Sequence, residues 1–173
     1  MTHRTLRELY EAHPGKASDK WNLYMEIYEE LFARLRGRAI DLLEIGVQNG
    51  GSLELWGKYF ECARNLVGCD IDARCAGLSF DDPRIRVVVG DAGAEGTAQR
   101  ILSAEGGFDV IIDDGSHRSG DIIRCFGRYF LRAEGRWMLR CRGLTLQLHS
   151  GLRRRALQSP FGHRVLQELR RSR

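Results

Sequence analysis

Short apolar runs alternate along most of this chain with segments whose apolar residues recur at helical spacing. Four of the runs predict buried strands, because a strand covered on both faces of a sheet reads as a continuous apolar stretch. These runs are residues 39–45, 66–69, 85–89 and 108–112. Residues 52–60, 95–104 and 120–131 have the spacing of amphipathic helices. Such alternation indicates an α/β fold with parallel strands joined by right-handed crossovers.

The last of these helices, 120–131, is expected to turn one apolar side toward the sheet. That inner side is predicted to hold Ile122, Ile123, Phe126, Tyr129 and Phe130. Its spacing is that of a helix packed on a sheet.

The first 37 residues precede the alternation. Residues 1–17 are polar and mixed, with a Pro14-Gly15 turn signal, and we treat them as a polar N-terminal segment. Ser18 or Asp19 could cap the helix that follows, which Gly37 would end. Its apolar stripe is rich in aromatic residues, and we interpret it as core packing rather than as a ligand site. The stripe consists of Trp21, Tyr24, Met25, Tyr28, Leu31, Phe32 and Leu35.

Length and composition favour one globular domain. The chain has 173 residues, and its hydrophobic content of 43% is ordinary for a globular protein. No apolar run approaches the roughly 18 residues of a membrane helix, and the N-terminus lacks the apolar core of a signal peptide. The five cysteines form no CxxC pair. We therefore expect a cytoplasmic protein with reduced thiols and no membrane partner.

Charge divides the chain more sharply than its net value of +4 suggests. Residues 136–173 hold ten arginines and a single acid, Glu168, so they carry +9 and residues 1–135 carry −5. We accordingly divide the chain into a polar segment 1–17, a domain 18–135 and an Arg-rich tail 136–173. A genuine basic tail could contact phosphates or another anionic surface.

The end of the run at 108–112 is the richest in candidate chemistry. Asp113, Asp114, Gly115, Ser116 and His117 follow it directly. Ligands of open α/β sheets bind where the carboxyl ends of strands meet loops. Adjacent carboxylates beside an imidazole suit binding of a hard metal ion and proton abstraction. The alternative is that the two acids only cap the next helix.

Acids also end the three preceding strands. Glu44 comes just before a glycine-rich turn, Gly46-Val47-Gln48-Asn49-Gly50-Gly51. Its GxxxGG spacing differs from the GxGxxG of dinucleotide sites, and Glu44 would repel a pyrophosphate but attract an ammonium or sulfonium group. Asp70 lies about one βαβ step later, where a ribose is usually bound. Asp91 ends the third strand and could accept a hydrogen bond from an adenine amino group.

With these motifs, ExGxxxGGSL, GxDID, GD and FDxxIDDGSH, the chain resembles class I S-adenosylmethionine-dependent methyltransferases. The likeness extends over about residues 18–135 and is greatest to the branch that contains macrolide-sugar O-methyltransferases and cephalosporin-biosynthesis relatives. It implies a doubly wound Rossmann-like methyltransferase sheet, here truncated after about strand four or five. It also implies a Mg²⁺-assisted methyl transfer to a hydroxyl of a sugar or polyol.

The resemblance assigns a place to each candidate residue. Glu44, Gly46, Gly50 and Ser52 would hold the methionine end of S-adenosylmethionine. Asp70 would hold the ribose and Asp91 the adenine, with Asp113 also in the cofactor site. Asp114 would be a Mg²⁺ ligand, and His117 the base that takes the hydroxyl proton. The acceptor would be a small molecule, and the resemblance leaves oligomerisation open.

The chain departs from the family after Gly135. A relative would continue with a strand ending in Glu-Asp, which supplies the remaining metal ligands, whereas this chain has Arg142 and Gly143 there. We interpret the departure as a reading-frame shift near Gly135. Shifted by one base, the codons of Trp137 and Met138 must read Gly and then Cys, and synonymous codons allow Tyr-Val-Ala-Glu-Asp to follow. We expect an impaired enzyme in that case. The alternatives are a nicotinamide-dependent oxidoreductase, which the glycine spacing disfavours, and a non-enzymatic anion or nucleic-acid binder, which the acidic body disfavours.

Overall fold

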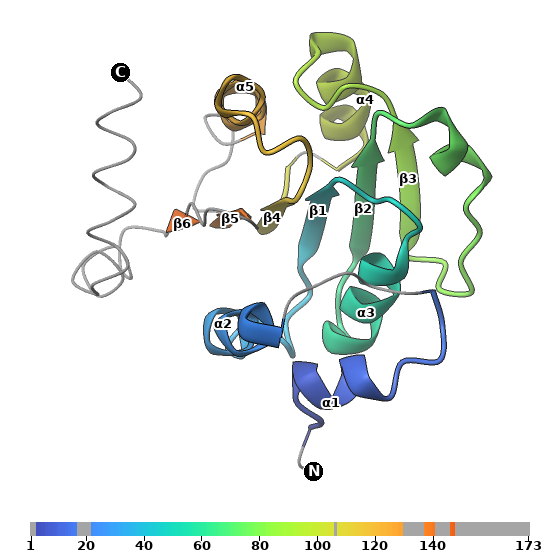
Figure 1. Ribbon diagram of the computed structural model, residues 1–173, viewed down its shortest axis with the longest axis vertical. Coiled ribbons are helices and arrows are strands. Elements are labelled where there is room, and N and C mark those ends of the chain that lie inside the picture. The colour runs from blue at the N-terminus through green and yellow to red at the C-terminus, as the bar shows by residue number, and fades with distance from the viewer. Residues whose placement is uncertain (1–2, 17–21, 106, 130–136, 141–145, 148–173) are drawn as a thin grey trace.

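A computed structural model describes residues 3–16, 22–105, 107–129, 137–140 and 146–147 (Figure 1). Its centre is one sheet with the strand order β3-β2-β1-β4-β5-β6, in which β1 to β5 pair in parallel and β6 pairs antiparallel with β5. The strands are β1 (Asp41–Ile45), β2 (Asn65–Asp70), β3 (Ile85–Val89), β4 (Val110–Asp113), β5 (Trp137–Arg140) and β6 (Leu146–Gln147). Because the chain runs outward from β1 to β3 and then returns to β4 on the other side of β1, the order reverses between β1 and β4. This confirms the doubly wound sheet.

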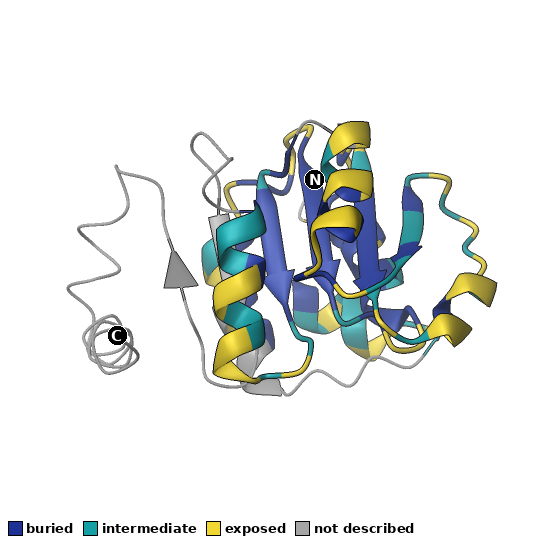
Figure 2. Ribbon diagram, turned by 90° about the horizontal axis from the view of Figure 1, so that it is seen from above, coloured by how far each residue is buried: buried dark blue, intermediate teal, exposed yellow. Residues whose placement is uncertain are grey.

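Helices cover both faces of the sheet, and alternate residues of β1 show which helices pack on which face. Leu42 belongs to a core cluster with α1 (Leu6–Glu11), α2 (Asn22–Phe32) and α3 (Gly51–Tyr59). Leu43 belongs to a second cluster, with α4 (Glu95–Glu105) and α5 (Ser119–Tyr129). Figure 2 shows the buried strands between helices whose outer sides are exposed.

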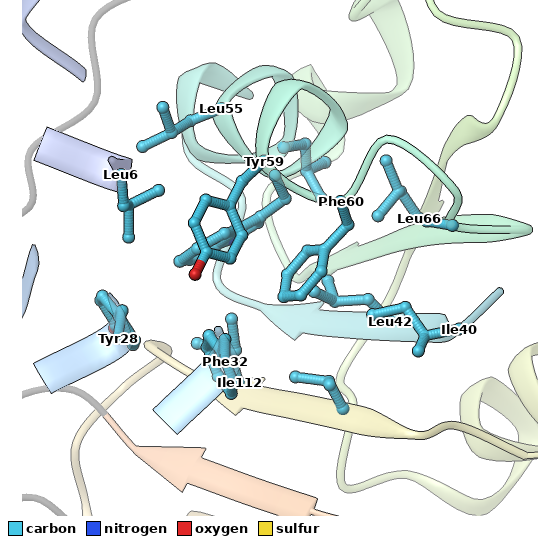
Figure 3. Close-up of a cluster of buried hydrophobic side chains, with 14 of the residues drawn as sticks. Leu6, Tyr28, Phe32, Ile40, Leu42, Leu55, Tyr59, Phe60, Leu66 and Ile112 are labelled. Atoms are coloured by element: carbon cyan, nitrogen blue, oxygen red, sulfur yellow. The ribbon is translucent and has the colours of Figure 1, made fainter. Parts of the chain in front are cut away.

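The aromatic stripe of α2 packs in the first cluster, as the sequence predicts. Tyr28 meets the ring of Trp56 edge-on at 5.1 Å between centroids, and Phe32 does so at 6.0 Å. Figure 3 shows Phe32 beside Ile112 of β4, with Tyr59 of α3 and Phe60, the residue that follows α3, across from α2. All of these side chains are buried, so this part of the stripe is core. The side chains of Trp21 and Tyr24 lie outside the described part of the chain.

Four details differ from expectation. The segment before residue 18 contains α1, whose start is closed by a capping box of Thr5 and Glu8 and whose Leu6 is fully buried. The helix α2 ends at Phe32 rather than at Gly37. A short 3₁₀ helix, η1 (Ala73–Gly77), follows β2. The expectation that Ile123 faces inward is wrong, because 57% of it is exposed, whereas Cys125 and Tyr129 point into the core.

The sheet also continues past residue 135. β5 pairs with β4 in parallel register, with Val110 opposite Trp137 and Asp113 opposite Arg140. Phe130, Arg142 and Gly143 lie outside the described residues, as does most of the Arg-rich segment. In the described part of the chain, no helix is long and apolar enough to span a bilayer.

Candidate active site at the carboxyl ends of the strands

A cleft of about 650 Å³ opens where β1, β2, β3 and β4 end. Its walls come from the loops after these four strands and from the helices α3, through Ser52, and α5. They include the glycine-rich turn after β1, the acidic residues that end β2 and β3, the segment from Asp113 to His117 after β4, and three residues of α5. Seven of the nine residues singled out in the sequence line this cleft: Gly46, Ser52, Asp70, Asp91, Asp113, Asp114 and His117.

Gly46 brings the turn after β1 against the loop after β4. Its φ of 88° lies in the left-handed region, which favours glycine. A Cβ at this position would lie 2.4 Å from the backbone oxygen of Asp114. Hydrogen bonds from Gly46 N to Cys69 O and from Asp114 N to Ile45 O, both 2.8 Å long, hold the three strand ends together. Gly46 thus sets the distance between the two loops that flank the cleft.

Asp70 fixes the glycine-rich turn from the neighbouring strand. Its Oδ2 accepts hydrogen bonds from Val47 N at 2.7 Å and Gln48 N at 2.9 Å, and its Oδ1 accepts one from Asp72 N at 2.9 Å. Gln48 has a φ of 54°, which is unusual for a residue other than glycine. Oδ1 accepts from one of these backbone donors and Oδ2 from two, and Asp70 lines the cleft, so Oδ1 is the better candidate to accept from a ligand hydroxyl.

Glu44 and Gly50 stand behind the cleft rather than in its wall. The Glu44 side chain is fully buried, and its carboxylate accepts hydrogen bonds from Ser52 Oγ at 2.6 Å and Trp56 Nε1 at 3.3 Å. Gly50 precedes α3 with a φ of 87°, and a Cβ there would lie 2.7 Å from the Phe80 ring. In this structure Glu44 therefore holds the first turn of α3, and it is Ser52 that reaches the cleft.

The opposite wall combines an acid with two buried thiols. Asp91 Oδ1 accepts a hydrogen bond from Gly93 N at 2.8 Å, while 46% of the side chain stays exposed to the cleft. Burial raises the pKa of both Cys69 and Cys125 to about 12, so both thiols stay protonated near neutral pH. They form an uncharged part of the wall.

The segment after β4 holds the candidate base. Asp113 is buried and its Oδ1 accepts a hydrogen bond from Gly115 N at 3.2 Å. The Nε2 of His117 lies 3.8 Å from Oδ1 of Asp114, and about a quarter of each side chain is exposed. His117 lines the cleft and has a φ of 59°, a left-handed conformation that is strained in a residue other than glycine.

The sequence did not point to three further cleft residues: Asp121, Arg124 and Cys125 of α5. Asp121 and Arg124 are an i, i+3 pair joined by a 2.8 Å ion pair. Their spacing was visible in the sequence, but it is typical of any solvent-exposed helix. The position of α5 over the strand ends brings them to the cleft.

A magnesium site needs several oxygen ligands. Within the described ranges, no group of three or more His, Cys, Asp or Glu side chains could hold a metal ion. Asp114 lines the cleft, but the described residues do not by themselves form a magnesium site.

Comparison with known proteins shows which proteins this chain is similar to. No protein-family model matches the chain. The chain is 38% identical over 125 residues to the 8-demethyl-8-alpha-L-rhamnosyl tetracenomycin-C 2'-O-methyltransferase of Streptomyces olivaceus, covering 66% of this chain and 32% of that protein. It is 33% identical over 110 residues to the mycinamicin VI 2''-O-methyltransferase of Micromonospora griseorubida, covering 60% of this chain and 27% of that protein.

The fold agrees with these matches. The crystal structure of the MycE methyltransferase from the mycinamycin biosynthetic pathway, in complex with Mg and SAH, is 28% identical, with a TM-score of 0.66. The match covers 80% of this chain and 37% of that one. The chain thus spans about a third of the length of the relatives it matches. In its sequence and its doubly wound sheet, the chain is similar to class I S-adenosylmethionine-dependent methyltransferases.

Proposed function

We propose that the cleft binds S-adenosylmethionine and that the protein is an O-methyltransferase acting on a sugar or polyol hydroxyl of a small molecule. The observation that carries this proposal is the convergence of a glycine-rich turn, two strand-end carboxylates and an imidazole on one cleft. The curated relatives methylate hydroxyls of sugar-bearing natural products, according to their names.

The cofactor would lie along the strand ends. Asp70 would accept from a ribose hydroxyl through Oδ1, and Asp91 would accept from the adenine amino group. The first turn of α3, which Glu44 holds through Ser52, would face the methionine end. Gly46, Gly50 and Asp113 would shape the cleft through the backbone. Glu44 would act from behind the wall, through the helix it positions.

Bound S-adenosylmethionine would supply a methyl group on a positively charged sulfur. An acceptor oxygen would attack the methyl carbon in line, and the carbon–sulfur bond would break to leave S-adenosylhomocysteine. The protein has to orient that oxygen and remove its proton. His117 would accept the proton from the acceptor hydroxyl. Asp114, 3.8 Å from its Nε2, would stabilise the imidazolium that forms. The neutral wall of Cys69 and Cys125 adds no competing base.

A bound Mg²⁺ ion would assist by lowering the pKa of the acceptor hydroxyl. Asp114 remains our proposed ligand, and any further ligands would have to come from outside the described ranges. Arg142 and Gly143 stand where the family resemblance calls for acids, and an arginine donates hydrogen bonds but cannot ligate a metal. We therefore propose that Mg²⁺ assistance, and with it turnover, is impaired in this chain.

Cofactor binding is tested by isothermal titration with S-adenosylhomocysteine and, separately, with NAD. We expect binding of S-adenosylhomocysteine alone, weakened about tenfold or more by Asp70→Asn, because that change turns an acceptor oxygen into a donor. Glu95→Gln, outside the cleft, serves as the control. Binding of NAD instead would favour the oxidoreductase.

Methyl transfer is tested with a labelled methyl donor and a rhamnosylated aromatic acceptor. Loss of a general base lowers rates by about 10²–10⁴-fold, so His117→Gln should abolish any measurable transfer. If the parent transfers methyl groups at a measurable rate, an equal rate in His117→Gln would remove His117 from the mechanism. Binding to nucleic acid that is sensitive to salt and is lost on deleting residues 136–173 would instead support an anion binder.

A further inference from the structure

A row of polar side chains crosses the mouth of the cleft from the β4 loop to the β3 loop. Ser116 Oγ donates a hydrogen bond to Asp121 Oδ2 at 2.5 Å. Arg124 Nη2 donates to Asp121 Oδ1 at 2.8 Å and lies 3.8 Å from Asp91 Oδ2. All four line the cleft. Asp121 is the central member, since each of its two oxygens has one of these partners.

At one end, Asp121 stabilises the loop that carries the candidate base. Ser116 immediately precedes His117, whose left-handed backbone costs free energy in any residue but glycine. Such a conformation persists only where neighbouring contacts enforce it. The Ser116 hydroxyl, which also accepts from Arg118 N at 3.3 Å, ties this loop to the first turn of α5.

At the other end, Asp121 and Asp91 compete for one guanidinium. Arg124 is 1 Å closer to Asp121 than to Asp91, and half of its side chain is exposed, so it can reorient at little cost. A closer pair between Arg124 and Asp91 would occupy the carboxylate that we assign to the adenine amino group. The Ser116 hydroxyl, and to a lesser degree Arg124, hold the pKa of Asp121 below its usual value, so Asp121 keeps its charge near neutral pH.

We propose that Asp121 is a positioning residue for both ends of the cleft. It holds the loop of Ser116 and His117 against α5, and it keeps Arg124 away from Asp91. The inference rests on the proposed function, which assigns the base to one end of the cleft and the adenine acceptor to the other. It adds a link between them: the residue that orders the base loop also leaves the adenine acceptor open.

The test uses the full chain and the variants Ser116→Ala, Asp121→Asn, Arg124→Gln and the double variant Asp121→Asn/Arg124→Gln. Glu95→Gln is the matched control, because it breaks a 3.0 Å ion pair between a first-turn acid of α4 and Arg128 of α5 without touching the cleft. The first readout is the ring signal of His117 in ¹H–¹³C spectra of ligand-free protein at fixed pH, assigned with His117→Gln. The second is the dissociation constant of S-adenosylhomocysteine.

We expect Ser116→Ala and Asp121→Asn to shift or broaden the His117 signal while the melting temperature and the control spectrum stay unchanged. Asp121→Asn should also weaken S-adenosylhomocysteine binding about three- to tenfold, and the added Arg124→Gln should restore it. That restoration is the result a merely structural role of Asp121 would not produce.

Either of two results would overturn the inference: an unmoved His117 signal in Asp121→Asn, or weakened binding that Arg124→Gln does not restore. Failure of the cofactor proposal looks different, because the parent protein would then bind no S-adenosylhomocysteine. In that event the His117 signal, recorded without ligand, still decides whether Asp121 orders the loop.

Discussion

Replacing Gly46 by alanine should destabilise the protein strongly, because two costs coincide at this residue. The backbone has a φ of 88°, and a left-handed conformation costs a residue with a Cβ about 1–2 kcal/mol. The new Cβ would also lie 2.4 Å from Asp114 O and 2.7 Å from Asp114 C, which are backbone atoms that cannot rotate away. Overpacking of this kind typically costs a further ~1–3 kcal/mol.

Together these costs come to about 2–5 kcal/mol, a large share of the ~5–15 kcal/mol that stabilises a typical domain. For a chain of this length each kcal/mol lowers the melting temperature by about 2–4 °C, so we expect a loss on the order of 4–20 °C. The assay is thermal and urea unfolding followed by tryptophan fluorescence, with buried Trp56 among the reporters. Gly96→Ala is the control, since a Cβ there has nothing within 4 Å.

The control should be neutral or slightly stabilising, because alanine is the better helix former by up to about 1 kcal/mol. If Gly46→Ala melts within 2 °C of the parent, the contact between the two loops is not as close as the structure has it. The reasoning about how the cleft is shaped would then be refuted.

Three further outcomes are expected. Arg84 hydrogen-bonds Asp82 and lowers its pKa in the folded state, so this pair stabilises the fold above the unfolded pKa of about 4 and ceases to do so as pH falls through the folded value. The deficit in melting temperature of Asp82→Asn should therefore shrink between pH 6 and pH 2.5, and a constant deficit would contradict this. Exposed Cys62 should react with a thiol reagent at pH 8 well before buried Cys69 and Cys125, whose pKa of about 12 keeps them protonated. Early labelling of either buried thiol in native protein would contradict the packing. Sequencing the coding DNA across codons 130–150 should show Gly-Gly-Cys-Tyr-Val-Ala-Glu-Asp in the +1 frame, and a stop or no acidic pair there would show the Arg-rich segment to be genuine.

The Arg-rich segment bears on how the site is completed. β5 lies in register beside β4, so the chain enters the sheet after residue 135. In a doubly wound sheet this edge of the cleft receives ligands from the end of the strand next to β4. Acids after that strand would favour a metal-assisted enzyme, and an arginine there would favour a protein that only binds the cofactor. The DNA test separates these two cases.

The sequence by itself determined the sheet and the line of acids along it. Continuous apolar runs signal strands buried on both faces, and parallel strands place their carboxyl ends at one edge. Asp70, Asp91, Asp113 and Asp114 could thus be assigned to one cleft before any contact was known. The glycine spacing was equally informative, since the left-handed backbone of Gly46 and Gly50 is a local requirement.

Only the tertiary structure decided which side of an element each side chain occupies. Glu44 points away from the cleft because strand residues alternate between faces and α3 offers it Ser52 and Trp56. Ile123 faces solvent because the direction of α5 turns Cys125 inward instead, beside Tyr129, which was predicted to face inward. The row from Ser116 through Asp121 and Arg124 to Asp91 joins residues up to 33 positions apart. It exists because packing sets α5 across the strand ends, which local pattern cannot specify.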